Sequence, residues 1–517
     1  MALGDSKQPT LLGFYLGLHD SNVAARVDGK LRYRKFERMS GIKHQRVALD
    51  AIRVACDEWG IRPDYVAFTD GNRNGLGSCI GEELWCSLPS IGSLAPNAKT
   101  YCLDHHYAHV LSAMPEMAGA NIVGIAIDGR GDNGIRARVV RFSGELDAQT
   151  MLSSSDFTIG RFFNRVGISL GLSGDDVDLA GKVMGAQAYG NVCKEFVSDL
   201  EMADPISLPD RLLYTIPWQG RQVWGATDFF DIRNQAFLDW LASAHDALGR
   251  AVLRFFSAYC SSDTQIVYAG GCAQNTVFNT ALFEAFPRLE IPPHAYDGGL
   301  SLGCIEFLRR KLRLPATDYA AFPFIQDDCD VGFASREVAQ QVAELIAEGK
   351  IVGWMQGNGE IGPRALGHRS ILMDPRISDG KAVLNERVKR REPWRPYAGS
   401  ILEPHVTSWF ETNAPSPYML RAIKTREERH ALIPGIVHHD GTCRIQTVNA
   451  ETPELEAFNT LLTTFFKLTG VPLVLNTSLN AGGEPIHGDP AQSMKLLRAG
   501  RIDALCVGNN LLVGADA

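Results

Sequence analysis

Three histidines lie within five residues in the stretch DHHYAHVLSAM, residues 104–114, where a polar segment runs into an apolar one. His105 and His109 are four residues apart and would share one face of a helix, whereas His106 would point about 100° away. Two imidazoles on one helical face can bind a metal ion, but the zincin motif HExxH is excluded because a histidine follows His105. The stretch by itself leaves open a metal site, acid/base chemistry, or histidines without a chemical role.

Two carboxylates elsewhere in the chain could complete a metal site. Asp128 follows an apolar run at 121–127, and Asp297 lies in the Gly-rich turn PHAYDGGLSLG at 293–303. Two neutral imidazoles and two carboxylates make a mixed nitrogen and oxygen site, which suits Fe(II), with Mn, Zn or Mg as alternatives, better than copper or an iron–sulfur cluster. The predicted metal ligands are His105, His109, Asp128 and Asp297.

Basic residues in the C-terminal half form a second group of candidates. Arg364 lies between a proline and an alanine in the loop GPRALGHRS, and Arg444 lies in HHDGTCRIQTV at 438–448. The segment NERVKRREPWRPYAGS at 385–400 adds Lys389, Arg390, Arg391 and Arg395. Cations that cannot neutralise one another require an anion, and the guanidinium fork matches phosphate oxygens. For Arg390 and Arg391, pairing with the flanking glutamates on a solvated face is an equal alternative.

The elements that must position these residues begin with two similar hairpins, at 11–33 and 121–146. In each, a buried strand runs into a polar turn, HDSN or DGRGD, and a second strand follows; a third strand, IVYAGG at 266–271, leads into CAQN. Glycines let backbone amides approach a phosphate, and acids can hold its metal. The repetition predicts duplicated halves with nucleotide or phosphate chemistry between them, although such turns also occur in other α/β proteins. The expected phosphate contacts here are Asp20, Gly129 and Gly131.

A polar loop, NTSLN at 476–480, follows a further predicted strand. Its amides and hydroxyls suit a nucleotide or carbonyl ligand, and Asn and Ser also occur in turns that bind nothing. The candidate binding residues in this loop are Asn476, Ser478 and Asn480.

The composition of the sequence changes near residues 312–334, where two prolines and an acidic cluster occur. This change predicts a domain boundary at about residue 330. After it, Ser335 is an N-cap signal, an apolar stripe follows at helical spacing, and Gly349 ends the helix before the strand at 351–355. We therefore expect an α/β protein with domains at 1–330 and 331–517.

Bulk composition narrows the class of protein. A length of 517 residues favours two or three domains. The net charge of −8 and a pI near 5.9 argue against a dedicated nucleic-acid binder. Eleven cysteines without a CxxC pair indicate reduced thiols. Without a signal sequence or a run of about 20 apolar residues, the expectation is a soluble cytoplasmic enzyme that binds neither membrane nor nucleic acid.

The ordered motifs together resemble the ATP-dependent O-carbamoyltransferases of antibiotic and other natural-product biosynthesis and of nodulation-factor biosynthesis. The resemblance covers almost the whole chain and rests on the HD pair at 19–20, DHHYAH, DGRGD, GKVMGAQAYG at 181–190, GGCAQN, DGG at 297–299, GPRALGHRS, KRRE–RP, HDGTCRIQ and NTSLN. It implies an N-terminal actin-like ATPase (Kae1-like) domain with duplicated halves and a C-terminal YrdC-like α/β domain. The first is akin to the subunit that completes threonylcarbamoyladenosine on transfer RNA, and the second to its adenylate-forming partner.

The resemblance also implies a mechanism. The C-terminal domain would make carbamoyl adenylate from carbamoyl phosphate and ATP, with Arg364, Lys389, Arg395 and Arg444 around that chemistry. The adenylate would reach the N-terminal metal site through the interior, where His19 is the candidate base for the hydroxyl of a small natural product. Residues expected to line the nucleotide are Lys182, Gly270, Gly271 and Asn275. A monomer or a homodimer is expected.

The chain departs from the family pattern after NTSLN, where Gly482 stands in place of a common arginine and Leu479 in place of a more usual aromatic residue. Either a neighbouring cation substitutes or the affinity of the donor site differs. The alternatives to a carbamoyltransferase of small molecules are a threonylcarbamoyladenosine enzyme acting on transfer RNA, an actin-like small-molecule kinase and a non-catalytic regulator. The acidic pI disfavours the first, and the basic and NTSLN motifs are unexplained by the second. The presence of all the catalytic candidates disfavours a non-catalytic regulator.

Overall fold

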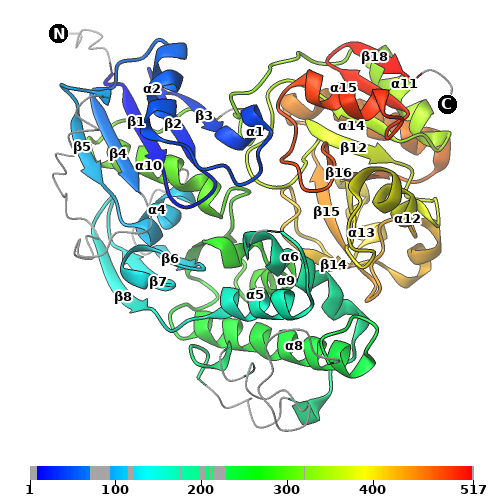
Figure 1. Cartoon of the computed structure of the whole chain (residues 1–517), viewed down its shortest axis with the longest axis horizontal. Coiled ribbons are helices and arrows are strands. Elements are labelled where there is room, and N and C mark those ends of the chain that lie inside the picture. Colours follow the sequence, from blue (N-terminus) through cyan, green and yellow to red (C-terminus); the bar gives the residue numbers. More distant parts are fainter. Residues whose placement is uncertain are drawn as a thin grey trace. The chain divides into compact units, whose positions relative to one another are not determined.

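The computed structural model describes residues 8–69, 94–114, 122–174, 176–196, 204–209, 212, 229–319 and 321–514. The α/β class is confirmed. The chain forms two compact units. The first unit contains residues 1–156, 259–273 and 286–328, and the second contains residues 157–258, 274–285 and 329–517. Figure 1 labels the elements along the chain.

The first unit contains two five-stranded sheets and the helices that cover them. Its strands are β1 (Leu11–Tyr15), β2 (Asn22–Val27), β3 (Lys30–Lys35), β4 (Tyr65–Thr69), β5 (Lys99–Cys102), β6 (Ile122–Ile127), β7 (Ala137–Phe142), β8 (Ala148–Ser154), β9 (Gln265–Ala269) and β10 (Leu289–Glu290). Its helices are α1 (Phe36–Ser40), α2 (Leu49–Glu58), α4 (His105–Ser112) and α10 (Leu300–Lys311).

The two sheets of the first unit repeat one topology. The first has the order β3-β2-β1-β4-β5, and the second reads β8-β7-β6-β9-β10 in the same direction. In each sheet, the first three strands of this order are antiparallel to their neighbours. The last two strands run parallel to the central strand, which is β1 in one sheet and β6 in the other. The duplicated halves predicted from the two hairpins are therefore confirmed. Because β1 and β6 are the central strands of their sheets, the polar turns that follow them lie at equivalent positions.

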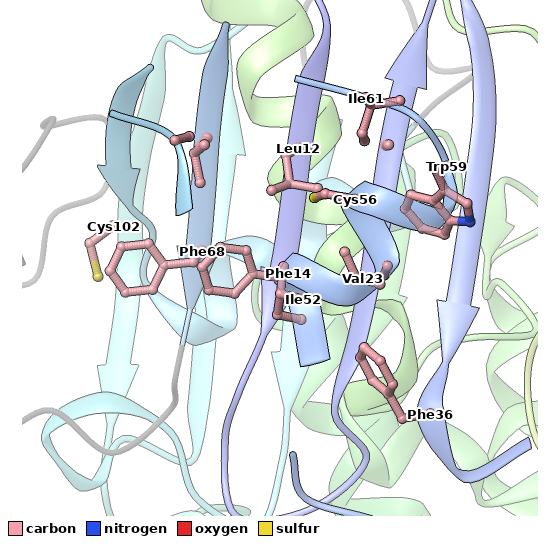
Figure 2. Close-up of a cluster of buried hydrophobic side chains, with 14 residues drawn as sticks. Leu12, Phe14, Val23, Phe36, Ile52, Cys56, Trp59, Ile61, Phe68 and Cys102 are labelled. Atoms are coloured by element: carbon pink, nitrogen blue, oxygen red, sulfur yellow. The ribbon is translucent and has the colours of Figure 1, made fainter. Parts of the chain in front are cut away.

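One face of the first sheet packs against α2. Leu12 and Phe14 alternate with residues of the other face along β1, and the rings of Phe14 and Phe68 stack with centroids 5.4 Å apart. Helix α2 presents Ile52 and Cys56, four residues apart, to this face. Figure 2 shows these side chains in one apolar cluster. Burial of this apolar stripe holds the helix on the sheet, and Glu58 at the end of α2 adds an ion pair with Arg34 of β3.

The opposite face of the same sheet packs against α10. A Cβ added at Gly13 in β1 would lie 2.3 Å from the carbonyl oxygen of Ser301 in α10, so only glycine allows this approach. Helix α10 in turn packs against α4, and α4 packs against β6 and β9 of the second sheet. Tyr15 shares the face of Gly13, since residues two apart in a strand point the same way. The end of β1 therefore faces the layer that carries the histidines.

The second unit contains one mixed eight-stranded sheet, with the order β14-β15-β13-β16-β12-β11-β17-β18. Its strands are β11 (Val352–Met355), β12 (Arg369–Met373), β13 (Ala398–Leu402), β14 (Ala422–Lys424), β15 (Thr442–Val448), β16 (Leu473–Ser478), β17 (Ala504–Val507) and β18 (Asn510–Val513). Its helices are α5 (Ile159–Ser169), α6 (Asp176–Ala186), α8 (Gln235–Ser257), α9 (Thr276–Ala285), α11 (Arg336–Ala347), α12 (Gly380–Leu384), α13 (Val406–Trp409), α14 (Glu456–Thr469) and α15 (Pro490–Arg498).

The helix predicted after residue 335 is α11, and Ser335 is its N-cap, with the hydroxyl accepting a hydrogen bond from the backbone N–H of Val338. The strand predicted at 351–355 is β11. Across the described part of the chain, no helix is both long enough and apolar enough to cross a membrane.

Candidate metal centre and cation cluster

Helix α4 brings the histidines into the interior of the first unit. Its N-cap, Asp104, accepts a hydrogen bond from the backbone N–H of Tyr107 and lies 3.2 Å from the Arg138 guanidinium. All eight residues of the helix are buried. The backbone N–H of His105, which has no partner within the helix, donates to Asp132 in the DGRGD turn at 3.0 Å. The cap and this turn therefore fix where the helix begins.

His105 and His109 point to the same place, as their spacing predicts. Their Nε2 atoms are 3.1 Å apart and lie 3.1 and 2.9 Å from one oxygen of Asp128. An oxygen of Asp297 lies 3.6 Å from His105 Nε2 and 3.3 Å from His109 Nε2. The ligand atoms of all four residues lie within 4.8 Å of one another. We call His105, His109, Asp128 and Asp297 the four-ligand cluster.

The charges of this cluster indicate what it binds. Burial opposes protonation of His109, but the Asp128 and Asp297 carboxylates outweigh it and raise the pKa of His109 to about 9. The pKa of His105 is also raised, against burial, mainly by Asp297. Burial would raise the pKa of Asp128, but the two histidines hold it well below the usual value. The carboxylates thus favour protonated imidazoles, and one divalent cation with neutral imidazoles would balance the two negative charges instead. The donor set fits a divalent metal.

Further contacts hold the two carboxylates in place. The Tyr15 hydroxyl donates to Asp297 at 2.6 Å, and Asn22 donates to the Asp297 carbonyl at 2.9 Å. The other oxygen of Asp128 accepts from the backbone N–H groups of Gly129 and Gly271. Each carboxylate therefore keeps one oxygen for the histidines, an arrangement that is typical of oriented metal ligands.

His106 lies outside the ligand set. It is fully buried, and burial together with the neighbouring His105 holds its pKa well below the usual value. Within the described residues neither of its ring nitrogens has a hydrogen-bond partner. Its ring packs edge-on against that of His105, with centroids 5.4 Å apart. His106 therefore packs beside His105 without offering a ligand atom to the four-ligand cluster.

His19 stands at the edge of the four-ligand cluster. Its Nδ1 lies 2.8 Å from Asp20 and 3.7 Å from Asp297, and its side chain is 34% exposed. Burial would lower the pKa of His19, but the hydrogen bond to Asp20 and the Asp297 carboxylate raise it to about 9. An imidazole that is oriented by a carboxylate and partly open to solvent has the geometry of a general acid or base.

The predicted phosphate-loop residues lie in both units. Gly129 and Gly271 meet at Asp128, and Gly131 and Gly270 occupy the turns after β6 and β9 of the first unit. Asn275 belongs to the second unit, where its side-chain oxygen caps α9 by accepting from Val277 and Phe278. The structure therefore groups four glycines with the four-ligand cluster, and gives Asn275 a capping contact.

The second unit brings the predicted arginines together. Burial, together with the charges of Arg364 and Arg395, lowers the pKa of Arg444 to about 9. Burial likewise lowers the pKa of Arg391 to about 10, with Arg395 and Arg444 among the causes. We call Arg364, Arg391, Arg395 and Arg444 the cation cluster. Mutual repulsion in a half-buried cluster is relieved by a bound anion, and phosphate oxygens match guanidinium geometry.

A polar network on the sheet holds the loop that carries Arg364. In β15, Gln446 is two residues from Arg444 and donates to the Leu366 carbonyl. Asn476 donates to the Ala365 carbonyl and to Ser400. Asn476, predicted to bind a ligand, therefore anchors the Arg364 loop through its amide.

Lys389 lies with the NTSLN loop. Its buried ammonium donates to the carbonyl oxygens of Ser478 and Asn480 and to the Asn480 side chain at 2.6 Å. The Ser478 hydroxyl donates to the same Asn480 oxygen. Lys389 is thus a cation that shapes this loop, and these three predicted residues form one group.

Close packing explains why a glycine stands at position 482, just after the NTSLN loop. A Cβ at this position would lie 1.8 Å from the Lys389 carbonyl oxygen. No residue with a side chain fits there without moving the backbone. The departure from the family pattern therefore goes with close packing of the loop on the segment that carries Lys389.

Lys182, expected among the nucleotide contacts, lies in α6 of the second unit. Its ammonium is 2.9 Å from Glu392, and its carbonyl accepts a hydrogen bond from Trp394. Glu392 is also 3.7 Å from Arg395 of the cation cluster. The segments GKVMGAQAYG and KRRE–RP, more than 190 residues apart, therefore meet in the second unit.

Comparison with known proteins identifies the family. A sequence profile described as "Carbamoyltransferase C-terminus" matches residues 343–513. The nodulation protein NolO of Bradyrhizobium diazoefficiens is 30% identical over 434 residues, which cover 78% of this chain and 78% of NolO. The chain belongs to the carbamoyltransferase family. The nodulation protein NolNO of Sinorhizobium fredii is 29% identical to this carbamoyltransferase over 446 residues, which cover 79% of it and 63% of NolNO.

Among solved structures, HypF of T. kodakarensis has 15% identity and a TM-score of 0.35 to this carbamoyltransferase, and the match covers 60% of this chain and 49% of HypF.

The sequence of this carbamoyltransferase did not point to several residues of the site. Tyr15 is one residue of an apolar strand, and only its strand parity with Gly13 signals that it faces α10. Lys35 lies 2.6 Å from Asp20 and donates to the hydroxyl of Tyr296, the residue before Asp297, and neither Lys35 nor Tyr296 belongs to a motif. The sequence offers Glu392 as an ion-pair partner for its neighbouring arginines, and its contact with Lys182 depends on the tertiary structure.

Proposed function

We propose that this carbamoyltransferase makes carbamoyl adenylate in its C-terminal domain and transfers the carbamoyl group to a hydroxyl at the metal site of its N-terminal domain. Two separate sites support this proposal. One is the four-ligand cluster with His19 beside it. The other is the cation cluster, whose guanidinium groups lie close enough to lower the pKa values of Arg391 and Arg444. The domain bounds that we propose are those expected from the sequence, 1–330 and 331–517.

The first half-reaction belongs to the cation cluster. Carbamoyl phosphate is hydrolysed to carbamate and phosphate. A carbamate oxygen then attacks the α-phosphorus of ATP, and the bond to pyrophosphate breaks. Negative charge increases on the phosphoryl oxygens, and fixed guanidinium groups such as Arg364, Arg395 and Arg444 stabilise it. Lys389 acts by holding Ser478 and Asn480 in position for the nucleotide.

The second half-reaction belongs to the four-ligand cluster. The acceptor oxygen attacks the carbamoyl carbon, AMP leaves, and His19 takes the hydroxyl proton. A divalent metal held by His105, His109, Asp128 and Asp297, with Fe(II) as the proposed ion, would supply Lewis-acid polarisation. The pKa of His19 falls when the charge of Asp297 is neutralised by a bound cation, because that carboxylate is one of the groups that raise it. A lower pKa makes the neutral form of His19, which acts as the base, more abundant. Backbone groups at Gly129, Gly131, Gly270 and Gly271 are proposed to contact the adenylate phosphate.

The acceptor is proposed to be a small natural product with a free hydroxyl. The partial exposure of His19 allows such a molecule to approach it. The names of the relatives NolO and NolNO connect those proteins with nodulation, so sugar hydroxyls are the first acceptors to test. Macrolide alcohols, cephem hydroxymethyl groups and alkaloids complete the panel.

The test is to incubate the protein with radiolabelled ATP, carbamoyl phosphate and the acceptor panel, and to separate the nucleotides and the acceptors. We expect AMP and pyrophosphate, with label from carbamoyl phosphate in one class of acceptor. ADP as the only nucleotide product would indicate a kinase, and absence of all turnover would indicate a regulator.

Two variants separate the half-reactions. His105→Ala should abolish metal binding and transfer while adenylate formation continues. His106→Gln is its matched control, because His106 neighbours the cluster without contributing a ligand, and it should keep both activities. Equal loss of adenylate formation in His105→Ala would contradict the proposed division between the domains.

A further inference from the structure

A second cluster of ionisable residues lies beside His19. Asp20, Glu37 and His44 offer ligand atoms that lie within 4.8 Å of one another, a spacing that could hold a metal ion. In this protein the chain itself provides the cation. The Lys35 ammonium lies 2.6 Å from an oxygen of Asp20 and 2.6 Å from an oxygen of Glu37. A lysine thus occupies the centre of what would otherwise be an acidic site.

Lys35 also contacts the turn that carries a metal-ligand candidate. Its ammonium donates to the Tyr296 hydroxyl at 2.9 Å and lies 4.7 Å from the centre of that ring. Tyr296 directly precedes Asp297. The Lys35 side chain is only 5% exposed, so solvent screens its interactions weakly. One ammonium therefore connects the His19 side and the metal side of the site.

The register of strand β3 places Lys35 at this position. β3 pairs antiparallel with β2, and Lys35 lies opposite Asn22, two residues after Asp20. The backbone N–H of Lys35 donates to the side chain of Gln326, which fixes the end of the strand. Asp20 itself has a left-handed backbone, with φ of 57°, a conformation that aspartate adopts more readily than most residues. Its backbone N–H donates to the His44 carbonyl oxygen, and its side chain binds the Lys35 ammonium.

Asp20 contacts both Lys35 and His19 and so connects them. One carboxylate oxygen binds the ammonium, and the other lies 2.8 Å from His19 Nδ1. His44 Nδ1 lies 3.1 and 3.2 Å from the same two oxygens and competes with His19 for the carboxylate. Without the ammonium, Asp20 could turn toward His44 and leave His19 without an orienting partner.

We propose that Lys35 is a positioning residue for carbamoyl transfer, which fixes the Asp20 carboxylate so that it orients His19 toward the acceptor hydroxyl. This inference rests on the proposed function, in which His19 is the base. It adds that a built-in ammonium, and not a second metal ion, organises the acids next to the base.

The test uses the full-length protein with Lys35→Met and Glu37→Gln combined. The second change removes the acid that would otherwise be left buried with an unpaired charge, so the double variant keeps the local charge balanced. Glu37→Gln alone is the matched control, because it retains the contact between Lys35 and Asp20. Lys30→Met, at an exposed position of the same strand, controls for loss of a lysine. If the double variant does not fold, Lys35→Gln with Glu37→Gln replaces it, under the same expectations.

Three measurements are compared. Pyrophosphate exchange with carbamoyl phosphate reports adenylate formation and should not change. Transfer to the panel compound that the parent protein carbamoylates fastest should lose about tenfold to a hundredfold in kcat, with KM for that compound changed less than about threefold, as expected for a group that orients another. The Nδ1 proton resonance of His19, identified by its loss in His19→Gln, should disappear in the double variant and persist in both controls.

The outcomes distinguish this inference from the proposed function. An unchanged His19 resonance and unchanged kcat in the double variant would overturn the role of Lys35. If the parent forms adenylate but carbamoylates no panel compound, the proposed acceptor class is wrong, and the resonance alone decides whether Lys35 positions His19. If His19→Gln transfers as fast as the parent, His19 is not the base and the inference fails with it.

Discussion

Metal binding by the four-ligand cluster should weaken steeply as the pH falls. Without metal, a pKa of about 9 leaves the His109 imidazole protonated at neutral pH, the pKa of His105 is raised in the same direction, and the lowered pKa of Asp128 keeps its carboxylate ionised. A metal ion binds only neutral imidazole, so binding must release these protons. We therefore expect between one and two protons to leave per metal ion bound.

The size of the effect follows from the pKa of His109. With a pKa of about 9, roughly 1% of His109 is neutral at pH 7, which reduces the apparent metal affinity by about 2.7 kcal/mol. Each unit of pH below 9 then costs about tenfold in affinity for this residue alone. Between pH 8 and pH 6 the affinity should fall by about a hundredfold, and by more because His105 also contributes.

The assay is a titration of the metal-free protein with Mn²⁺ at pH 6, 7 and 8, followed by electron paramagnetic resonance of the free ion. Calorimetry in two buffers of different ionisation enthalpy counts the released protons. His106→Gln, which changes a histidine outside the ligand set, should show the same dependence. A change in affinity of less than about threefold between pH 8 and pH 6 would mean that the two histidines are neutral before binding or are not ligands, and would refute the electrostatic argument.

Folding stability provides an independent check of the same charges. The folded-state pKa of His109 is raised above 6.5, so its ion pairs stabilise the metal-free protein fully below pH 6.5, and this stabilisation is lost as the pH rises through about 9. The Tm of the metal-free protein should therefore fall across this window. The metal-loaded protein should keep its Tm there, because its imidazoles are already neutral.

Three substitutions test other parts of the structure. Arg444→Met should reduce pyrophosphate exchange by at least about a hundredfold and yet raise the Tm, because it removes a buried charge that neighbouring arginines repel; a lower Tm would contradict the repulsion within the cation cluster. Tyr15→Phe should weaken Mn²⁺ binding about tenfold by releasing Asp297, whereas Tyr107→Phe, whose hydroxyl has no hydrogen-bond partner among the described residues, should bind Mn²⁺ as the parent does. Gly482→Ala should lower the Tm by several degrees because its Cβ meets the Lys389 carbonyl, and an unchanged Tm, equal to that of the control Gly144→Ala, would show that the loop can move.

Local patterns in the sequence predict several features of the fold. The two hairpins with polar turns after a buried strand predicted the duplicated halves, and the topology of the two sheets agrees. The spacing of His105 and His109 placed them on one helical face, and Ser335 marked the start of a helix. These features depend on residues that are close in sequence, where backbone geometry alone sets which side chains meet.

Contacts between distant segments could not be predicted in this way. The meeting of Asp128 and Asp297 at the histidines was expected from their chemistry, but the geometry that leaves each one oxygen for the metal depends on Tyr15 and on amides from two turns. The pairing of Lys182 with Glu392 joins segments that the sequence assigned to different domains. In the sequence, Lys389 is one of several basic residues in a row. Only the folded structure shows that its ammonium donates hydrogen bonds to Ser478 and Asn480.

The sequence by itself determined the ligand types, the phosphate-type turns and the basic segments, because these are properties of residue type and short spacing. Tertiary structure decided which charges are balanced. Lys35 is neutralised inside an acidic cluster, whereas Arg444 lies among like charges. The physical reason is that burial and the distance between charged groups set their pKa values and their need for a partner, and both quantities arise only when strands and helices from remote parts of the chain pack together.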